Sequence, residues 1–340
     1  MPEMTTVLFT WNVEERLRDF LDNRIGTLPS IEVIFPADTS PQAIVKLAPS
    51  ADIIVGWRPT EELLLAAKKL QLFINPGAGV QHLIEPFKRL GRSREVQLAN
   101  CHGNSYFVAQ HAVALLLALM NKIIPHHNWM VAGKWRKGDK DAKSIPIKER
   151  KIGLLGYGAI NTKAHKFLAS FDPEFSILRK DWGKHDVHLP APAKKFSFSE
   201  LHLFLDEIDT LIVAMPLTSL THDLIRTREL DLLGSRGLVV NVARGQIINE
   251  EALFIALKKK IIAGAAIDVW YDYHPTPDSH GRRYPFSLPF QQLENVVLSP
   301  HRAASPFDDL QRWSEIIENI ERFSKGDKEL INIIDLEKEY

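Results

Sequence analysis

The stretch KIGLLGYGAIN, residues 151–161, predicts the fold of this chain. An apolar strand runs into Gly156-Tyr157-Gly158 and then into a segment with helical spacing. In a dinucleotide site the first glycine permits a tight turn, and the second lets the backbone approach a pyrophosphate at the helix N-terminus. The third glycine position holds Asn161, which we expect to loosen the packing of helix on strand. The strand–turn–helix context indicates nucleotide binding, and the alternative is an ordinary strand–helix turn.

The rest of the chain repeats this pattern of short β-type runs alternating with amphipathic segments, which predicts βαβ units and parallel sheets. The expected strands are 6–10, 31–35, 53–56, 72–76, 151–156, 175–178, 210–214, 238–242, 263–269 and 296–299. The expected helices include 59–69, 108–121, 161–170, 227–233, 250–258 and one within 307–324. Two segments show neither the alternation of a strand nor the spacing of a helix. We expect Pro125–Glu149 to be an arm or loop and the proline-rich segment Tyr271–Gln292 to be a long surface loop.

Bulk properties narrow the class of protein. A chain of 340 residues favours two domains, and 42 basic against 42 acidic residues argue against nucleic acid or an anionic membrane as the main partner. The single cysteine, Cys101, forms no internal disulfide and suits a reducing cytosol. The longest apolar stretch, Ala112–Met120, is shorter than the roughly 20 residues of a membrane helix. We expect a cytoplasmic protein without a signal peptide, a membrane span or a metal site.

The strand after the glycine turn bears on the choice of dinucleotide. Phe175–Leu178 is followed by Arg179-Lys180-Asp181. An acidic residue at such a strand end grips a ribose 2′-hydroxyl, whereas cations suit a 2′-phosphate. The pair Arg179 and Lys180 therefore favours NADP over NAD. One alternative is that these residues form a solvated turn. The other is that Asp181 binds the ribose 2′-hydroxyl, although it lies one or two residues beyond the usual position.

Further segments follow the turn in a recognisable order. They are MPLTSLTHDLI (215–225), LVVNVARGQIINEEAL (238–253), GAAIDVW (264–270) and LSPHRAAS (298–305), with NPGAGVQHL (75–83) and NCHGNSYFVAQHAVALLLAL (100–119) upstream. Together they resemble the D-isomer-specific 2-hydroxyacid dehydrogenase family. The resemblance implies two Rossmann-like, doubly wound parallel-sheet domains. A cofactor domain of residues 102–302 would be inserted in a substrate-side domain of residues 1–101 plus 303–340. Hinges are expected near 101–103 and 302–306, and the family's usual assembly is a homodimer.

Hydride transfer between a carbonyl and a nicotinamide needs a general acid/base and a cation for the substrate carboxylate. His301, after a strand and a proline, fits the first need, and Arg244 in NVARG fits the second. The alternative for His301 is a structural role, and the alternative for Arg244 is a surface ion pair. With the family's other positions, the substrate-side residues are Ala78, Gly79, Asn104 and Arg244. The cofactor-side residues are Gly156, Gly158, Ala159, Ile160, Arg179, Lys180, Met215, Pro216, Thr221, Val242, Ala243, Arg244, Asp268 and His301.

One family position departs from the pattern. Members commonly carry a glutamate five residues after the Asp of DVW, where it bonds the catalytic imidazole and raises its pKa. Here that position is Tyr273, flanked by Asp272 and His274, and any of the three could orient His301. Without the carboxylate we expect His301 to keep a lower pKa, so that reduction fades at a lower pH than in relatives.

The sequence therefore predicts an NAD(P)-dependent enzyme that interconverts a small 2-keto acid and a D-2-hydroxy acid, of glyoxylate/hydroxypyruvate type or related. The alternative is an NAD(H)-binding sensor, as in corepressors that resemble the family, and a third reading is formate oxidation. The substrate stays open, because it depends on side chains such as Trp11, Trp57 and Arg58 that sequence alone does not place. Trp135 is expected to pack in a dimer rather than close over the site.

Overall fold

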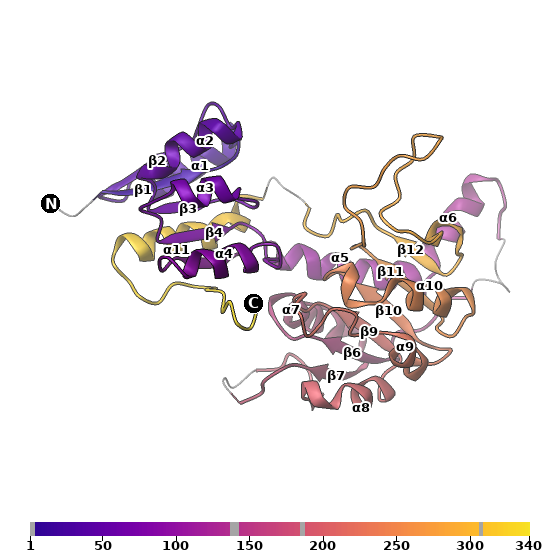
Figure 1. Ribbon diagram of the computed structural model, residues 1–340. Helices are drawn as coiled ribbons and strands as arrows, with labels where there is room; N and C mark the ends of the chain where they lie inside the picture. Colours follow the sequence, from indigo (N-terminus) through magenta and orange to yellow (C-terminus); the bar gives the residue numbers. More distant parts are fainter. Residues whose placement is uncertain (1–3, 137–142, 184–187, 306–308) are drawn as a thin grey trace. The chain divides into compact units, whose positions relative to one another are not determined.

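The chain folds as two compact units in this computed structural model, which describes residues 4–136, 143–183, 188–305 and 309–340. Residues 1–104 and 306–340 form unit 1, and residues 105–305 form unit 2, so the second is inserted in the first (Figure 1). Both are α/β units around a parallel sheet, as the sequence predicts. The last residue of the expected second hinge, Pro306, and the start of the expected helix 307–324 lie outside the described residues.

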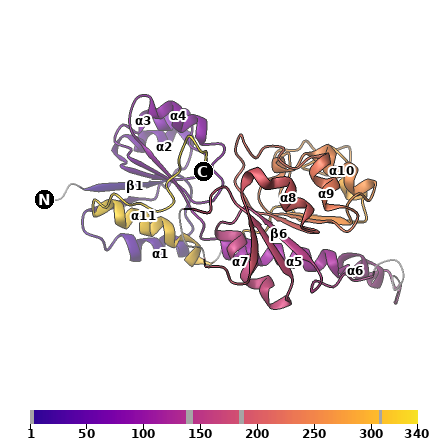
Figure 2. The ribbon, with the colours of Figure 1, turned by 90° about the horizontal axis from the view of Figure 1, so that it is seen from below.

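Unit 1 is built on a five-stranded parallel sheet. Its strands are β1 (Thr5–Phe9), β2 (Ile31–Ile34), β3 (Ile53–Val55), β4 (Leu72–Asn75) and β5 (Gln97–Asn100), in the order β2-β1-β3-β4-β5. Its helices are α1 (Glu15–Ile25), α2 (Pro41–Leu47), α3 (Glu61–Ala66), α4 (Ile84–Gly91) and α11 (Ser314–Ser324). Helices α1 and α11 lie side by side and share one core cluster, while α2, α3 and α4 pack into the other (Figure 2). The strand order reverses between β1 and β3.

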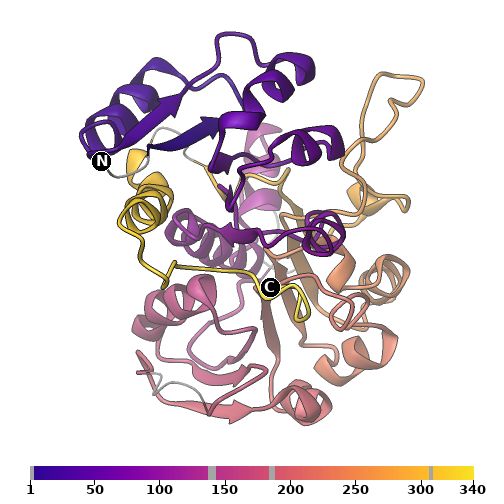
Figure 3. The same ribbon diagram turned by 60° about the vertical axis from the view of Figure 1, so that its left-hand side comes forward.

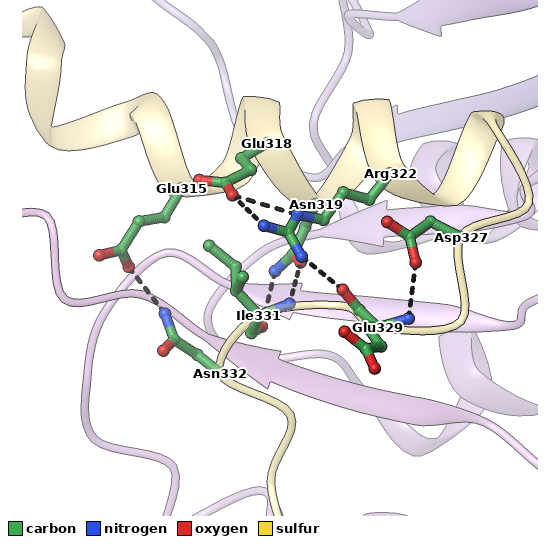
Figure 4. Close-up of polar contacts among 8 residues, drawn as sticks. All are labelled: Glu315, Glu318, Asn319, Arg322, Asp327, Glu329, Ile331 and Asn332. Atoms are coloured by element: carbon green, nitrogen blue, oxygen red, sulfur yellow. Dashed lines mark hydrogen bonds and ion pairs between the residues drawn. The ribbon is translucent and has the colours of Figure 1, made fainter. Parts of the chain in front are cut away.

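The C-terminal segment of unit 1 is tied to α11 by side-chain bonds (Figure 4). Asn319 donates its amide to the Ile331 carbonyl at 3.0 Å and accepts from the Ile331 N–H at 2.8 Å. Asn332 donates to Glu315 at 3.0 Å, and Glu315 also accepts from the His102 N–H at 2.6 Å. These bonds hold the start of α11 against the end of β5.

Unit 2 is built on a seven-stranded parallel sheet. Its strands are β6 (Lys151–Leu155), β7 (Glu174–Leu178), β8 (Ala193–Phe196), β9 (Thr210–Val213), β10 (Leu238–Asn241), β11 (Gly264–Ile267) and β12 (Val296–Leu298), in the order β12-β11-β10-β9-β6-β7-β8. Its helices are α5 (Ser105–Met120), α6 (Ile123–Val131), α7 (Ala159–Leu168), α8 (Leu201–Asp206), α9 (Thr227–Leu233) and α10 (Glu250–Lys258). Helices α5 and α7 share one core cluster, and α8, α9 and α10 share the other. Because the central strands are buried on both faces, they read as continuous apolar runs.

All ten expected strands are present within two or three residues at their ends, but two strands were missed. These are β5 and β8, whose sequences QLAN and AKKF are short and partly polar. The expectation of an arm or loop over Pro125–Glu149 is wrong in its first part, because residues up to Val131 form α6. Pro125 is the third residue of that helix, in the first turn, where a missing N–H costs no helical bond. Residues 137–142 of the same segment lie outside the described ranges.

The expected loop 271–292 contains no strand or α-helix in the structure, in which all of its residues are described. It ends in the 3₁₀ turn Phe290–Gln292 and is the long orange extension in Figure 3. Within the described ranges, no single helix is long and apolar enough to cross a membrane. The pair α5 and α6, bent by 63°, meets the length and composition requirement only when the two helices are taken together.

Candidate active site

The predicted site residues of unit 2 follow the carboxyl ends of its strands. Because the strands are parallel, these ends share one edge of the sheet. Gly156 follows β6, Arg179 follows β7, Met215 follows β9, Val242 to Arg244 follow β10, Asp268 follows β11 and His301 comes just after β12. The strand order reverses between β6 and β9, at the glycine turn. Ligands of open α/β sheets bind outside the strand ends at such a reversal.

The two glycines of the turn serve different purposes. Gly156 has φ of +81°, and a Cβ there would lie 2.7 Å from the Met215 Cβ and 2.8 Å from the Ala214 carbonyl oxygen. The fold itself therefore requires this glycine. A Cβ on Gly158, the N-cap of α7, would meet no atom within 4 Å. The space at the helix N-terminus is open, as a pyrophosphate would need.

Asn161 does not loosen the helix, contrary to the sequence expectation. Its side chain is fully buried, and its amide donates to the carbonyl oxygens of Gly156 at 2.6 Å and of Leu155 and Ile212 at 3.3 Å. A glycine at this position would allow close packing, whereas the asparagine joins α7 to β6 and β9 by hydrogen bonds. The turn keeps its shape by a polar contact instead of a missing side chain.

The end of β7 presents a positive group to the glycine turn. The guanidinium of Arg179 lies over the Trp182 ring, 5.3 Å from its centroid. Burial raises the pKa of Tyr157 to about 12, and the positive charge of Arg179 opposes that rise, which puts Arg179 near the turn. Asp181 accepts a bond from the Gly183 N–H at 2.7 Å, so its carboxylate is used in its own loop. The arrangement suits a 2′-phosphate better than a 2′-hydroxyl.

Arg244 and His301 come together on unit 2, although 57 positions separate them in the sequence. Partial desolvation by its neighbours lowers the pKa of His301, and the positive charge of Arg244 lowers it further, while Asp268 opposes the change. His301 has φ of +55°, a left-handed conformation that is rare for a residue with a side chain. Such strain persists only where neighbours hold it, and it is common at functional sites.

Tyr273 lies against His301 where the family's glutamate would be. The two ring centroids are 5.2 Å apart at an angle of 63°. Tyr273 keeps 42% of its surface exposed, but partial desolvation raises its pKa and the charge of Arg244 opposes the rise, so Tyr273 is a neutral phenol near both groups. Asp272 instead accepts a bond from the His274 N–H at 2.8 Å, in an exposed turn. Of the three alternatives left open by the sequence, Tyr273 is the one in ring contact with the imidazole.

Asp268 holds the loop that carries His301. Its side chain is fully buried and accepts bonds from the Ser299 hydroxyl at 2.5 Å, the Arg302 N–H at 2.8 Å and the Ala303 N–H at 3.0 Å. Burial alone would raise the pKa of Asp268, but these bonds and His111 outweigh it and lower the pKa. The residues on both sides of His301 are thus fixed by one carboxylate.

Sequence reasoning missed His111 and Ser299. The His111 ring, on α5, is 2.9 Å from the Ser299 hydroxyl, which in turn bonds Asp268. Residue 111 faces β12 only because α5 packs on that side of the sheet. Its helical position carries no sequence signal for this contact, whereas Ser299, two residues before His301, could have been suspected.

The remaining residues predicted to contact the cofactor lie after β9 and β10 and at the start of α7. Thr221 donates its hydroxyl to the Pro216 carbonyl at 2.7 Å and accepts from the Thr218 N–H at 2.8 Å, so it shapes its own loop. Val242 and Ala243 are buried, and Ala159 and Ile160 begin α7. Within the described residues no group of three or more His, Cys, Asp or Glu side chains could hold a metal ion.

The three substrate-side residues of the amino-terminal segment belong to unit 1. Ala78 and Gly79 lie in the turn after β4. The carbonyl groups of this turn accept hydrogen bonds from two asparagine side chains. Asn75 donates to the Gly77 carbonyl at 2.5 Å, and Asn100 donates to the Ala78 carbonyl at 2.7 Å. Among the residues that the structure describes, none accepts a bond from the N–H of Ala78 or Gly79. Asn104 is the last residue of the first segment of unit 1.

Comparison with known proteins agrees with this geometry. The NAD-binding-domain profile of the D-isomer-specific 2-hydroxyacid dehydrogenases matches residues 113–303, more than half of the chain. The chain belongs to that family. This dehydrogenase family member is thus an oxidoreductase with an NAD-binding domain in unit 2.

Two curated relatives of the family member are reductases. A glyoxylate reductase of Thermofilum pendens is 29% identical over 82% of this chain and 80% of its own length. A glyoxylate/hydroxypyruvate reductase of Arabidopsis thaliana is 27% identical over 80% of this chain and 79% of its own. Among solved structures, a D-isomer-specific 2-hydroxyacid dehydrogenase from Xanthobacter autotrophicus, in complex with NADPH and MES, has a TM-score of 0.78. It is 22% identical, covers 99% of this chain and is itself covered completely.

Proposed function

We propose that this family member reduces a small 2-keto acid to a D-2-hydroxy acid with NADPH. The observation that carries the proposal is the meeting of Arg244, Tyr273 and His301 at the sheet edge that also bears the glycine turn. In this proposal residues 102–302 are the cofactor domain, and residues 1–101 with 303–340 are the substrate-side domain. The family match and the reductase relatives support the reaction class.

The residues at the strand ends fit a dinucleotide. The open space at Gly158 admits a pyrophosphate, with Ala159 and Ile160 above it at the start of α7. Arg179 and Lys180 would hold a 2′-phosphate, which favours NADPH over NADH. The dinucleotide, when bound, supplies the hydride. The NADPH complex of the Xanthobacter structure supports this preference without deciding it. Met215, Pro216, Thr221, Val242 and Ala243 would line the nucleotide. The predicted contact of Asp268 with the cofactor does not fit the structure, because its carboxylate is fully buried and already accepts bonds from Ser299, Arg302 and Ala303.

The chain's own groups supply the rest of the chemistry. Arg244 grips the substrate carboxylate through two parallel bonds and keeps its charge at every physiological pH. The N–H groups of Ala78 and Gly79 would offer donors to a carboxylate, and Asn104 would be a further substrate contact. His301, as imidazolium, gives its Nε2 or Nδ1 proton to the carbonyl oxygen as negative charge develops there. Tyr273 orients the imidazole without adding a negative charge, so the imidazole gives up its proton readily.

Two other readings remain outcomes of the test. A nucleotide sensor would bind the dinucleotide without turnover, and the comparisons do not favour it, because the relatives named above are reductases. Formate oxidation would need a polar pocket closed from water, and the same assay with formate tests it. Both are separated from the proposal by whether a 2-keto acid is reduced.

We also propose a cytoplasmic homodimer assembled through α6. This helix buries none of its side chains, and its apolar residues are exposed, namely Ile123, Ile124, Met130 and Val131, together with Trp135 beyond its end. Several exposed apolar side chains on one short helix are typical of an interaction site. The free, buried thiol of Cys101 is consistent with a reducing compartment.

The decisive experiment follows absorbance at 340 nm with NADPH or NADH and a panel of 2-keto acids. We expect turnover with NADPH, and its loss by about a thousandfold in His301→Ala and Arg244→Ala. His280→Ala, an exposed histidine in the loop after β11, is the matched control and keeps full activity. Tight NADPH binding without turnover on any 2-keto acid would overturn the proposal.

A further inference from the structure

A cluster of tryptophans stands at the point in unit 1 where its strand order reverses. Trp11 follows β1, and Trp57 follows β3, the two strands between which the order β2-β1-β3-β4-β5 changes direction. Gly56 brings these strand ends together, since a Cβ there would lie 2.1 Å from the Thr10 hydroxyl oxygen. Ligands of open α/β sheets bind outside the strand ends at such a reversal, and in unit 1 the residues at this edge are aromatic.

The tryptophans support one another. The centroids of Trp11 and Trp57 are 4.6 Å apart, and Trp313, at the start of α11, stacks on Trp11 at 5.7 Å. Trp313 is buried, whereas Trp57 keeps 39% of its surface exposed. The backbone of Trp57 is fixed as well, because its carbonyl group is 2.6 Å from the His82 ring nitrogen. Trp57 is thus a rigid platform with one exposed side.

This platform adjoins the turn proposed to receive the substrate carboxylate. A Cβ built on Gly77 would lie 3.8 Å from the indole nitrogen of Trp57 and 4.0 Å from its Cδ1. Gly77 directly precedes Ala78 and Gly79, whose N–H groups have no acceptor among the described residues. Because Gly77 adjoins Ala78 in the chain, a 2-keto acid anchored on that turn would lie close to the indole, where a large side chain could contact it.

We propose that the substrate is a 2-keto acid with an aromatic or bulky apolar side chain, which stacks on Trp57. The inference rests on the proposed reduction and departs from the small substrates named for the two relatives above. Glyoxylate has no side chain to place on the indole, and hydroxypyruvate has only a hydroxymethyl group. Aromatic rings gain from stacking in addition to the area they bury.

The charges around the cluster argue against a cationic side chain. Arg312 already lies over Trp313, 5.7 Å from its ring centroid, and the exposed Arg58 follows Trp57 directly. Glu315, an acidic group near the start of α11, is engaged by His102 and Asn332. Two guanidinium groups beside the platform repel an ammonium or a third guanidinium.

The test measures kcat/KM with NADPH for phenylpyruvate, 4-methyl-2-oxopentanoate, hydroxypyruvate and glyoxylate. We expect the intact protein to prefer phenylpyruvate over glyoxylate by about tenfold or more. Trp57→Ala should remove most of that preference by raising KM for phenylpyruvate, while glyoxylate is unaffected. Trp57→Phe keeps a ring and should retain part of it. Leu65→Ala, an exposed side chain on α3, is the control and should leave the preference unchanged.

The outcomes separate this inference from the proposed function. Reduction of none of the four acids overturns the function itself. Reduction of glyoxylate or hydroxypyruvate in preference to the bulky acids overturns only the substrate class. An unchanged preference in Trp57→Ala, with a melting temperature like that of the intact protein, also overturns the role of Trp57. If Trp57→Ala does not fold, the same preference measured in Trp57→Phe and Trp57→Leu decides.

Discussion

Restoring a carboxylate at position 273 should change the pH dependence of reduction. In the intact protein the His301 side chain is exposed at the surface, but partial desolvation by its neighbours and the positive charge of Arg244 lower its pKa below the ordinary value of about 6.5. Reduction needs the imidazolium as proton donor, so kcat/KM should fall as the pH rises through that lowered pKa. In Tyr273→Glu a negative charge replaces a neutral phenol next to the imidazole, so the proton is held to a higher pH.

The size of the shift follows from the contact between the two side chains. The rings of Tyr273 and His301 are 5.2 Å apart, and we take this as the separation of the new charge pair. At an effective dielectric constant of about 20–40, the attraction is about 1.6–3 kcal/mol, which corresponds to about 1–2 pKa units. Arg244 also attracts the new carboxylate, so the lower end of this range is the firmer expectation.

The assay is kcat/KM for reduction from pH 5 to about 9, in intact protein, Tyr273→Glu and Tyr273→Gln. We expect the falling limb to move upward by about 1–2 units in Tyr273→Glu only. The glutamine variant has the same shape without the charge and should keep the limb of the intact protein. Superimposed limbs in all three proteins would refute the reasoning, as would a profile of the intact protein that stays flat above about pH 8.

Three further predictions concern the cofactor edge and stability. Gly158→Ala should weaken NADPH binding by about tenfold or more, as measured by fluorescence titration, but should not lower the melting temperature, because its Cβ enters open space. Gly156→Ala should weaken binding and also lower the melting temperature measured by calorimetry, because its Cβ would collide with Met215. The double variant of Arg179 and Lys180 to Ala should raise the dissociation constant of NADPH but not of NADH, and equal losses would contradict a 2′-phosphate site. Burial lowers the pKa of His165 to about 4 in the folded protein. As the pH falls below about 6.5, His165 therefore becomes protonated in the unfolded chain but stays neutral in the folded one. The free energy of unfolding should therefore drop by about 2–3 kcal/mol toward pH 4, and urea titrations of His165→Gln should lack that component.

Local sequence predicted the glycine turn and ten of the strands β1–β12. The strand, turn and helix of residues 151–168 are contiguous in the sequence, and the turn requires a positive φ at Gly156. The central strands were found because burial on both faces leaves an uninterrupted apolar run. Strands β5 and β8 at the sheet edges were missed because they lack that run. Arg244 and His301 were found only because NVARG and SPH resemble a known family.

Tertiary structure decided which side chains meet. Tyr273 and His301 are 28 positions apart, and His111 and Ser299 are 188 apart, so no local period links either pair. Their contacts arise because parallel strands bring every carboxyl end to one edge while α5 packs beneath β12. The role of Asn161 was likewise invisible in sequence, since the acceptors of its amide come from two different strands. A residue's type is local information, but the identity of its neighbours depends on how distant segments pack.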